Sequence, residues 1–184
     1  MNSDLRSINE YQIQEDLGLK AVGPSIRKFP LQLVSPQGQL QIHTACYRGS
    51  FSIVLSEALR VAGLGSNVLI AQFLKGGVEQ GLNKATNLCG QLKWIRPDIP
   101  FCITEGKKQF PERTDSDIRN AINELWSFCK EQLVTKSIDR LVLDEIGLAS
   151  EFGYIEESDL ISTLEERPAA TDVILTGPAL SSKI

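Results

Sequence analysis

The chain has 184 residues, 42% of them hydrophobic and 23% charged, which suits one globular domain with a sizeable core. Its formal net charge of −4 argues against a broad basic surface of the kind that binds nucleic-acid phosphates, so no nucleic-acid partner is expected. The N-terminus carries acidic residues and no apolar stretch, and no window approaches the roughly 18 apolar residues of a membrane span, which predicts a protein of the cytoplasm or an organelle stroma.

Residues 1–30 are polar, weakly periodic and interrupted by glycine and proline, which indicates an N-terminal arm rather than core. The domain is expected over residues 31–184. It begins with an apolar run at 31–34, a turn containing Pro36 and Gly38, and a second run at 40–43, a spacing that favours a hairpin.

Strand and helix signals then alternate along the chain. A helical period over residues 53–62 stops at Gly63 and Gly65, and the apolar run 68–74 is typical of a buried parallel strand. A short strand is predicted at 92–95, and a weaker one at 101–103.

The strongest helix signal begins at Thr114, with Asp117 placed as its capping partner. A buried strand at 141–145 ends in two carboxylates, an amphipathic helix at 155–166 stops before Pro168, and a last strand occupies 172–176. This order predicts an α/β fold: a parallel sheet with helices on both faces, in three layers α/β/α.

The cysteines give no sign of a metal site. Cys46, Cys89, Cys102 and Cys129 form no CxxC pair, and the single His43 has no zinc-site spacing to them. We expect four reduced thiols, mostly buried.

In a parallel α/β sheet the first strand-to-helix turn is a natural phosphate site, because free N–H groups and the helix dipole favour an anion. Here that turn spans residues 43–52, HTACYRGSFS.

Several segments together resemble the ATP:corrinoid adenosyltransferase family, a P-loop group that transfers the adenosyl moiety of ATP to the reduced cobalt of a cobalamin precursor. The similar stretches, in order, are ALRVAGLG at 58–65, QFLKG at 72–76, VLDE at 142–145, and ERP at 166–168 running into VILTG at 173–177. The resemblance implies the P-loop fold, and it places Asp144 and Glu145 at the family's Walker-B-like carboxylates.

The phosphate loop departs from the family pattern Gly-x-Gly-Lys-Gly-Lys-[Ser/Thr]-[Ser/Thr]. Ala45 and Tyr47 stand where that pattern has glycines, and we expect the turn to be collapsed or its concavity to be occupied by the Tyr47 ring. Ser50 replaces the phosphate-binding lysine, and Phe51 replaces the hydroxyl that holds Mg²⁺.

The leading hypothesis is a non-catalytic binding or assembly module on this fold, with a protein partner or a second copy of itself. The alternatives are an active transferase, the only case in which ATP, Mg²⁺ and a corrinoid are expected, and an unrelated P-loop ligase or kinase. No catalytic residue and no metal ligand is assigned. The candidates for a vestigial nucleotide site are Thr44, Arg48, Gly49, Ser50, Ser52, Arg60, Lys75, Asp144 and Glu145.

Overall fold

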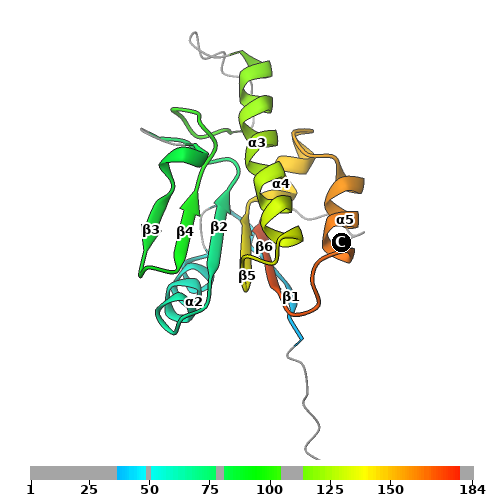
Figure 1. Cartoon of the computed structure of the whole chain (residues 1–184). Helices are drawn as coiled ribbons and strands as arrows, with labels where there is room; N and C mark the ends of the chain where they lie inside the picture. The colour runs from blue at the N-terminus through cyan, green and yellow to red at the C-terminus, as the bar shows by residue number, and fades with distance from the viewer. Residues whose placement is uncertain (1–36, 49–50, 78–80, 105–113, 179–184) are drawn as a thin grey trace, which may run out of the picture. The chain divides into compact units, whose positions relative to one another are not determined.

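The computed structural model describes residues 37–48, 51–77, 81–104 and 114–178, all of which lie in the unit formed by residues 35–184. In this part of the chain six strands form one sheet in the order β1-β6-β5-β2-β4-β3 (Figure 1). Neighbouring strands are parallel except β3 and β4, which form an antiparallel pair at one edge. The strands are β1 (Leu40–Thr44), β2 (Val68–Gln72), β3 (Thr86–Leu88), β4 (Leu92–Ile95), β5 (Arg140–Asp144) and β6 (Asp172–Gly177).

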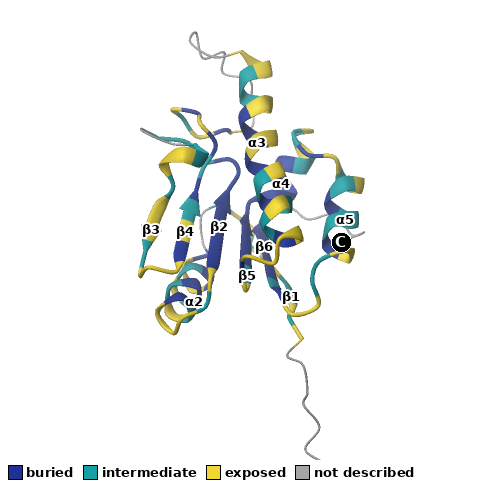
Figure 2. Cartoon of the chain, in the orientation of Figure 1, coloured by how far each residue is buried: buried dark blue, intermediate teal, exposed yellow. Residues whose placement is uncertain are grey.

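Helices cover both faces of the sheet because alternate residues of the central strands point to opposite sides. Ile70 and Val142 pack in a cluster with α2 (Ser52–Gly63). Leu69 and Leu141 pack in another cluster with α3 (Asp115–Val134), α4 (Ile146–Glu151) and α5 (Glu157–Glu165). Figure 2 shows the resulting buried centre of the sheet along β2 and β5. The predicted α/β fold with a parallel sheet between helices is confirmed.

Most of the predicted elements appear with small changes at their ends. The helix predicted at 53–62 is α2, and the buried strand predicted at 68–74 ends at Gln72. The helix predicted at 155–166 is α5, which begins only at Glu157 because Glu156 is still extended. The predicted capping box of α3 is present: the Thr114 side chain accepts from the Asp117 N–H, and the Asp117 side chain accepts from the Thr114 N–H.

The strand predicted at 101–103 is wrong. Ile103 donates its N–H to the carbonyl of Leu74, which lies past the end of β2, so no ladder forms. Three short elements were missed, namely β3, α4 and a 3-10 turn at Leu82–Lys84. The segment 31–34, the expected partner of β1 in a hairpin, lies outside the described residues.

The expectation of mostly buried cysteines is wrong as well. Cys129 is buried on α3, but Cys46, Cys89 and Cys102 are exposed because they lie in loops and turns rather than on core-facing positions. All of them are free thiols. No helix among the described residues is long and apolar enough to cross a membrane.

Candidate ligand site at the carboxyl edge of the sheet

A row of polar side chains crosses the carboxyl ends of the parallel strands. Gln72, Asp144 and Thr176 are direct neighbours in the register of β2, β5 and β6. Each lies two residues beyond an apolar residue of the α2 cluster, such as Ile70 or Val142, so all three side chains face the α2 side. Ligands of open parallel sheets bind outside this edge.

Asp144 is the centre of this row, and its carboxylate is almost completely buried. Thr176 Oγ1 donates to Oδ1 at 2.6 Å, and Gln72 Nε2 donates to Oδ2 at 2.6 Å. Lys75 Nζ, in the loop after β2, forms an ion pair with the same Oδ2 at 2.8 Å. A buried carboxylate needs such partners, because an unpaired charge in the interior is very costly.

Gln72 extends the network to β4. Its Oε1 accepts hydrogen bonds from Trp94 Nε1 at 2.9 Å and from Arg96 Nε at 2.8 Å. The Arg96 guanidinium also lies over the Trp94 ring, 6.0 Å from its centroid. The polar row thus connects β6, β5, β2 and β4.

The sequence analysis did not identify four members of this network, namely Gln72, Trp94, Arg96 and Thr176. A signal existed for two of them, because Gln72 and Thr176 are polar residues at or next to the end of a buried strand.

Glu145 is held by a second cation. Arg48, from the loop after β1, makes a two-pronged pair with it: Nε to Oε1 and Nη2 to Oε2, both 2.7 Å. Arg48 Nη1 also donates to the carbonyl oxygen of Ile103 at 2.6 Å. The hydrogen bonds to Glu145 raise the pKa of Arg48 above its ordinary value, against the opposing effect of partial burial.

The backbone at Glu145 adopts a strained conformation. Its φ of 61° lies in the left-handed region, and its N–H donates to the carbonyl of Thr176 at 2.8 Å. A non-glycine residue there costs on the order of 1 kcal/mol, and such strain concentrates at functional sites. The turn sends the Glu145 carboxylate toward the loop that carries Arg48.

The loop after β2 is packed tightly against residues 99–103. A Cβ at Gly76 would lie 2.2 Å from the carbonyl oxygens of both Ile99 and Phe101, so only glycine fits there. Gly77 donates its N–H to the Ile99 carbonyl at 2.9 Å, and Ile103 donates to that of Leu74 at 2.9 Å. These contacts hold Lys75 where it reaches Asp144, and the Ile103 carbonyl where it accepts from Arg48.

Four of the nine candidate residues therefore meet at this edge: Arg48, Lys75, Asp144 and Glu145. Gly49 and Ser50 lie outside the described residues. Thr44 is exposed at the end of β1, and Ser52 is exposed at the start of α2.

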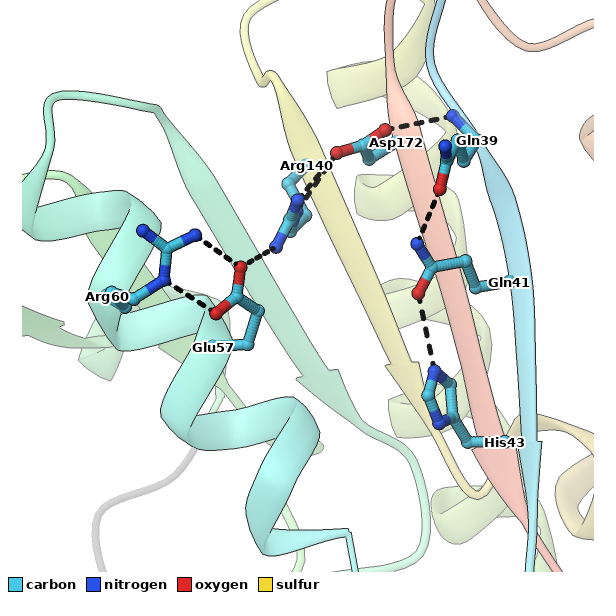
Figure 3. Close-up of polar contacts among 7 residues, drawn as sticks. All are labelled: Gln39, Gln41, His43, Glu57, Arg60, Arg140 and Asp172. Atoms are coloured by element: carbon cyan, nitrogen blue, oxygen red, sulfur yellow. Dashed lines mark hydrogen bonds and ion pairs between the residues drawn. The ribbon is translucent and has the colours of Figure 1, made fainter.

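Arg60 has its contacts elsewhere on α2. Its guanidinium pairs with Glu57 through two hydrogen bonds of 2.7 Å, and Glu57 in turn lies 3.7 Å from Arg140 of β5 (Figure 3). The same view shows His43 beside Gln41, both on β1, and their Nε2 and Oε1 atoms are 3.4 Å apart. Arg60 therefore belongs to a surface ion-pair network on α2 and β5. His43 contacts the neighbouring Gln41 side chain of its own strand.

The loop side chains differ from the expectation in one respect. Tyr47 is 67% exposed, so its ring does not fill the concavity, and Arg48 is the loop residue that reaches the carboxyl edge. Phe51 is 7% exposed and packs in the α2 cluster. The prediction that Tyr47 occupies the site is therefore wrong, because its ring is largely exposed and Arg48 is the side chain that pairs with a buried carboxylate. The other form of that prediction, a collapsed turn, depends on residues 49–50, which lie outside the described residues.

Comparisons with known proteins match most of this unit. The family described as ATP:corrinoid adenosyltransferase BtuR/CobO/CobP matches residues 36–184. The corrinoid adenosyltransferase of Escherichia coli K12 is 26% identical over 147 residues, covering 79% of this chain and 70% of that protein. The corrinoid adenosyltransferase of Pseudomonas aeruginosa is 25% identical over 142 residues, 77% of this chain and 66% of that protein. An uncharacterized protein of Nostoc sp. is 25% identical over 174 residues, 88% of this chain but only 45% of its own length.

Proposed function

This chain belongs to the ATP:corrinoid adenosyltransferase family, and we propose that within it the protein is a non-catalytic binding or assembly module whose Mg-ATP chemistry has been lost. One observation carries the proposal. Both carboxylates at the end of β5 are already engaged by cations of the protein itself, Asp144 by Lys75 and Glu145 by Arg48.

The described donor groups do not fit a Mg²⁺ ion. Magnesium requires oxygen ligands in near-octahedral geometry and is bound through carboxylates, hydroxyls, water and phosphate. Here Asp144 accepts three hydrogen bonds and both oxygens of Glu145 accept from Arg48. Phe51, at the position of the family's metal-binding hydroxyl, offers a hydrocarbon ring buried in the α2 cluster.

The sequence of the loop supports the same proposal. A lysine at position 50 would neutralise phosphate charge in the transition state, and this chain has serine there. Removing one preorganised electrostatic group typically costs about 3–4 kcal/mol, and the lysine and the metal-binding hydroxyl are both absent. If the two losses are roughly additive, the rate falls on the order of 10⁴-fold or more.

An active transferase is the alternative, and the match to the family over residues 36–184 favours it. In that case Arg48 or Lys75 would supply the positive charge that Ser50 cannot. The same family match argues against the other alternative from the sequence, an unrelated P-loop ligase or kinase.

The discriminating experiment mixes the protein with ATP, Mg²⁺ and a chemically reduced corrinoid and follows the corrinoid absorbance. The corrinoid adenosyltransferase of Escherichia coli serves as the positive control. We expect no change beyond that of the protein-free mixture. A catalysed change that disappears in Arg48→Met but persists in Arg60→Met would establish the transferase instead.

The assembly part of the proposal predicts self-association or a stable partner protein. Light scattering of the purified protein over a range of concentrations tests it, together with analysis of what co-purifies. A strict monomer at high concentration with no co-purifying protein contradicts it.

We place the protein in the cytoplasm or an organelle stroma, which cell fractionation would check.

A further inference from the structure

β1 is an edge strand of the sheet. Among the described strands it pairs only with β6, to which it runs parallel (Figure 1). Val173 of β6 donates its N–H to the carbonyl of Gln39, just before β1. Because the backbone groups of successive residues point to opposite sides of a strand, every second residue after Gln39 also faces β6. The N–H and carbonyl groups of Leu40, Ile42 and Thr44 therefore point away from β6, along the outer edge of β1.

This outer edge lacks the sequence features that commonly prevent strand pairing. Natural edge strands are often protected by lysine, by proline or by a bulge. The β1 sequence LQIHT contains no lysine, arginine, acidic residue or proline, and its register with β6 is unbroken over all five residues. Ile42 at its centre is 42% exposed, and it is the only exposed large hydrophobic residue within the described strands. Such an edge is a template for another strand.

The residue pattern of β1 is complementary to itself. If two copies pair antiparallel around a twofold axis at Ile42, the two Ile42 residues face each other and exchange both backbone hydrogen bonds. Leu40 of each copy then faces Thr44 of the other, which satisfies the remaining outward groups. On the other face of the strand, Gln41 lies opposite His43 of the second copy. These two side chains already contact each other within one strand (Figure 3), and no like charges meet.

We infer that the outer edge of β1 binds the same edge of a second copy of this chain and joins the two sheets into one. This inference rests on the assembly part of the proposed function and names its partner. A copy is favoured because the outward residues are arranged symmetrically around Ile42 and no charge selects a different partner. A pair of five-residue strands is a small interface, so we expect a reversible dimer with a dissociation constant on the order of 100 μM.

Amide hydrogen exchange of the whole chain, followed by NMR at several protein concentrations, tests the pairing residue by residue. The N–H groups of Gln41 and His43 face β6, so their exchange should be slow at every concentration. Those of Leu40, Ile42 and Thr44 should exchange rapidly in dilute protein, and several-fold more slowly once the protein concentration exceeds the dissociation constant. Sedimentation equilibrium over the same range should show a monomer–dimer equilibrium.

Variants of Ile42 test the interface directly. Ile42→Pro removes the central outward N–H and leaves the hydrogen bonds to β6 in place. Each dimer then loses two hydrogen bonds, so its dissociation constant should rise about thirtyfold or more. Ile42→Lys places two ammonium groups opposite each other and should abolish the dimer over the same concentration range. Leu64→Lys makes the same charge change at an exposed position just after α2 and should leave the dissociation constant unchanged. If Ile42→Pro fails to fold, Ile42→Lys decides.

The outcomes separate this inference from the proposed function. A dimer whose three outer amides stay unprotected, or that survives Ile42→Lys, overturns the β1 interface and leaves the assembly proposal standing. A different protein bound at β1 has the same meaning. Outer amides protected equally at every concentration show that a segment of the same chain covers the edge, which also overturns this inference alone. A strict monomer with no co-purifying protein overturns both. A β1 dimer that transfers adenosyl groups overturns the non-catalytic function and leaves this inference standing.

Discussion

Replacing Arg48 with methionine tests the pairing at the carboxyl edge. The substitution leaves the Glu145 carboxylate, 1% exposed, without both of its 2.7 Å hydrogen bonds. Removing one partner of a buried ion pair typically costs 3–5 kcal/mol. Because Arg48 is 29% exposed, water can enter the vacated space, so we take the lower end, about 3 kcal/mol.

Neutralising Glu145 as well should recover most of that loss. In Arg48→Met with Glu145→Gln no buried charge is left, and the remaining cost is that of lost hydrogen bonds, about 1 kcal/mol. The coupling between the two positions is therefore about 2 kcal/mol plus the cost of Glu145→Gln alone, which a double-mutant cycle with all three variants measures.

Urea unfolding at pH 7 provides the measurement. With a slope of about 2 kcal/mol per molar urea, the single variant should lower the midpoint by about 1.5 M, and the double variant by about 0.5 M. Arg60→Met, which breaks an exposed pair, should leave the midpoint unchanged. A loss below about 0.5 kcal/mol in Arg48→Met, or a double variant no more stable than the single, would refute the buried pairing.

Three further outcomes are expected. Lys136 has a φ of 52° just after α3, so Lys136→Gly should raise the free energy of unfolding by about 0.5–1 kcal/mol; a decrease would contradict the left-handed backbone. Hydrogen bonds from Lys130 and then Trp126 lower the pKa of Asp159 on α5, so its stabilising effect is present above the unfolded-state pKa of about 3.9 and is lost as pH falls through the lower folded-state pKa. Asp159→Asn should therefore cost about 0.5–1 kcal/mol at pH 7 and nothing at strongly acidic pH, and a pH-independent cost would be inconsistent with this link between α3 and α5. Phe51→Thr, which restores the family's hydroxyl, should lose about 3 kcal/mol of core packing in thermal unfolding, and an unchanged melting temperature would show that the ring is not buried.

The sequence predicts those parts of the fold whose apolar residues follow a helical spacing or form a continuous run. α2 and α3 have helical spacing, and β2 and β5 are continuous apolar runs, so their existence follows from local sequence. β3, with three residues, and α4, with six, are too short to show a period. The weak strand at 101–103 failed because the residue that pairs with Ile103 lies beyond the end of β2.

The candidate site is predictable only in part because its contacts are non-local. The motif VLDE identified Asp144 and Glu145, but the cation on Glu145 comes from a residue 97 positions earlier. Gln72 lies opposite Asp144 only because β2 pairs with β5, and the order of strands in a sheet cannot be predicted from local sequence patterns. The left-handed turn at Glu145, which directs its carboxylate to Arg48, has no signal in the residue type.

Calorimetry with ATP, with and without Mg²⁺, tests the central claim most directly. With both carboxylates engaged by protein cations and no lysine at position 50, we expect weak binding, with a dissociation constant on the order of 1 mM or above, nearly indifferent to Mg²⁺. Micromolar binding that depends on Mg²⁺ would contradict the loss of Mg-ATP chemistry and would favour the active transferase.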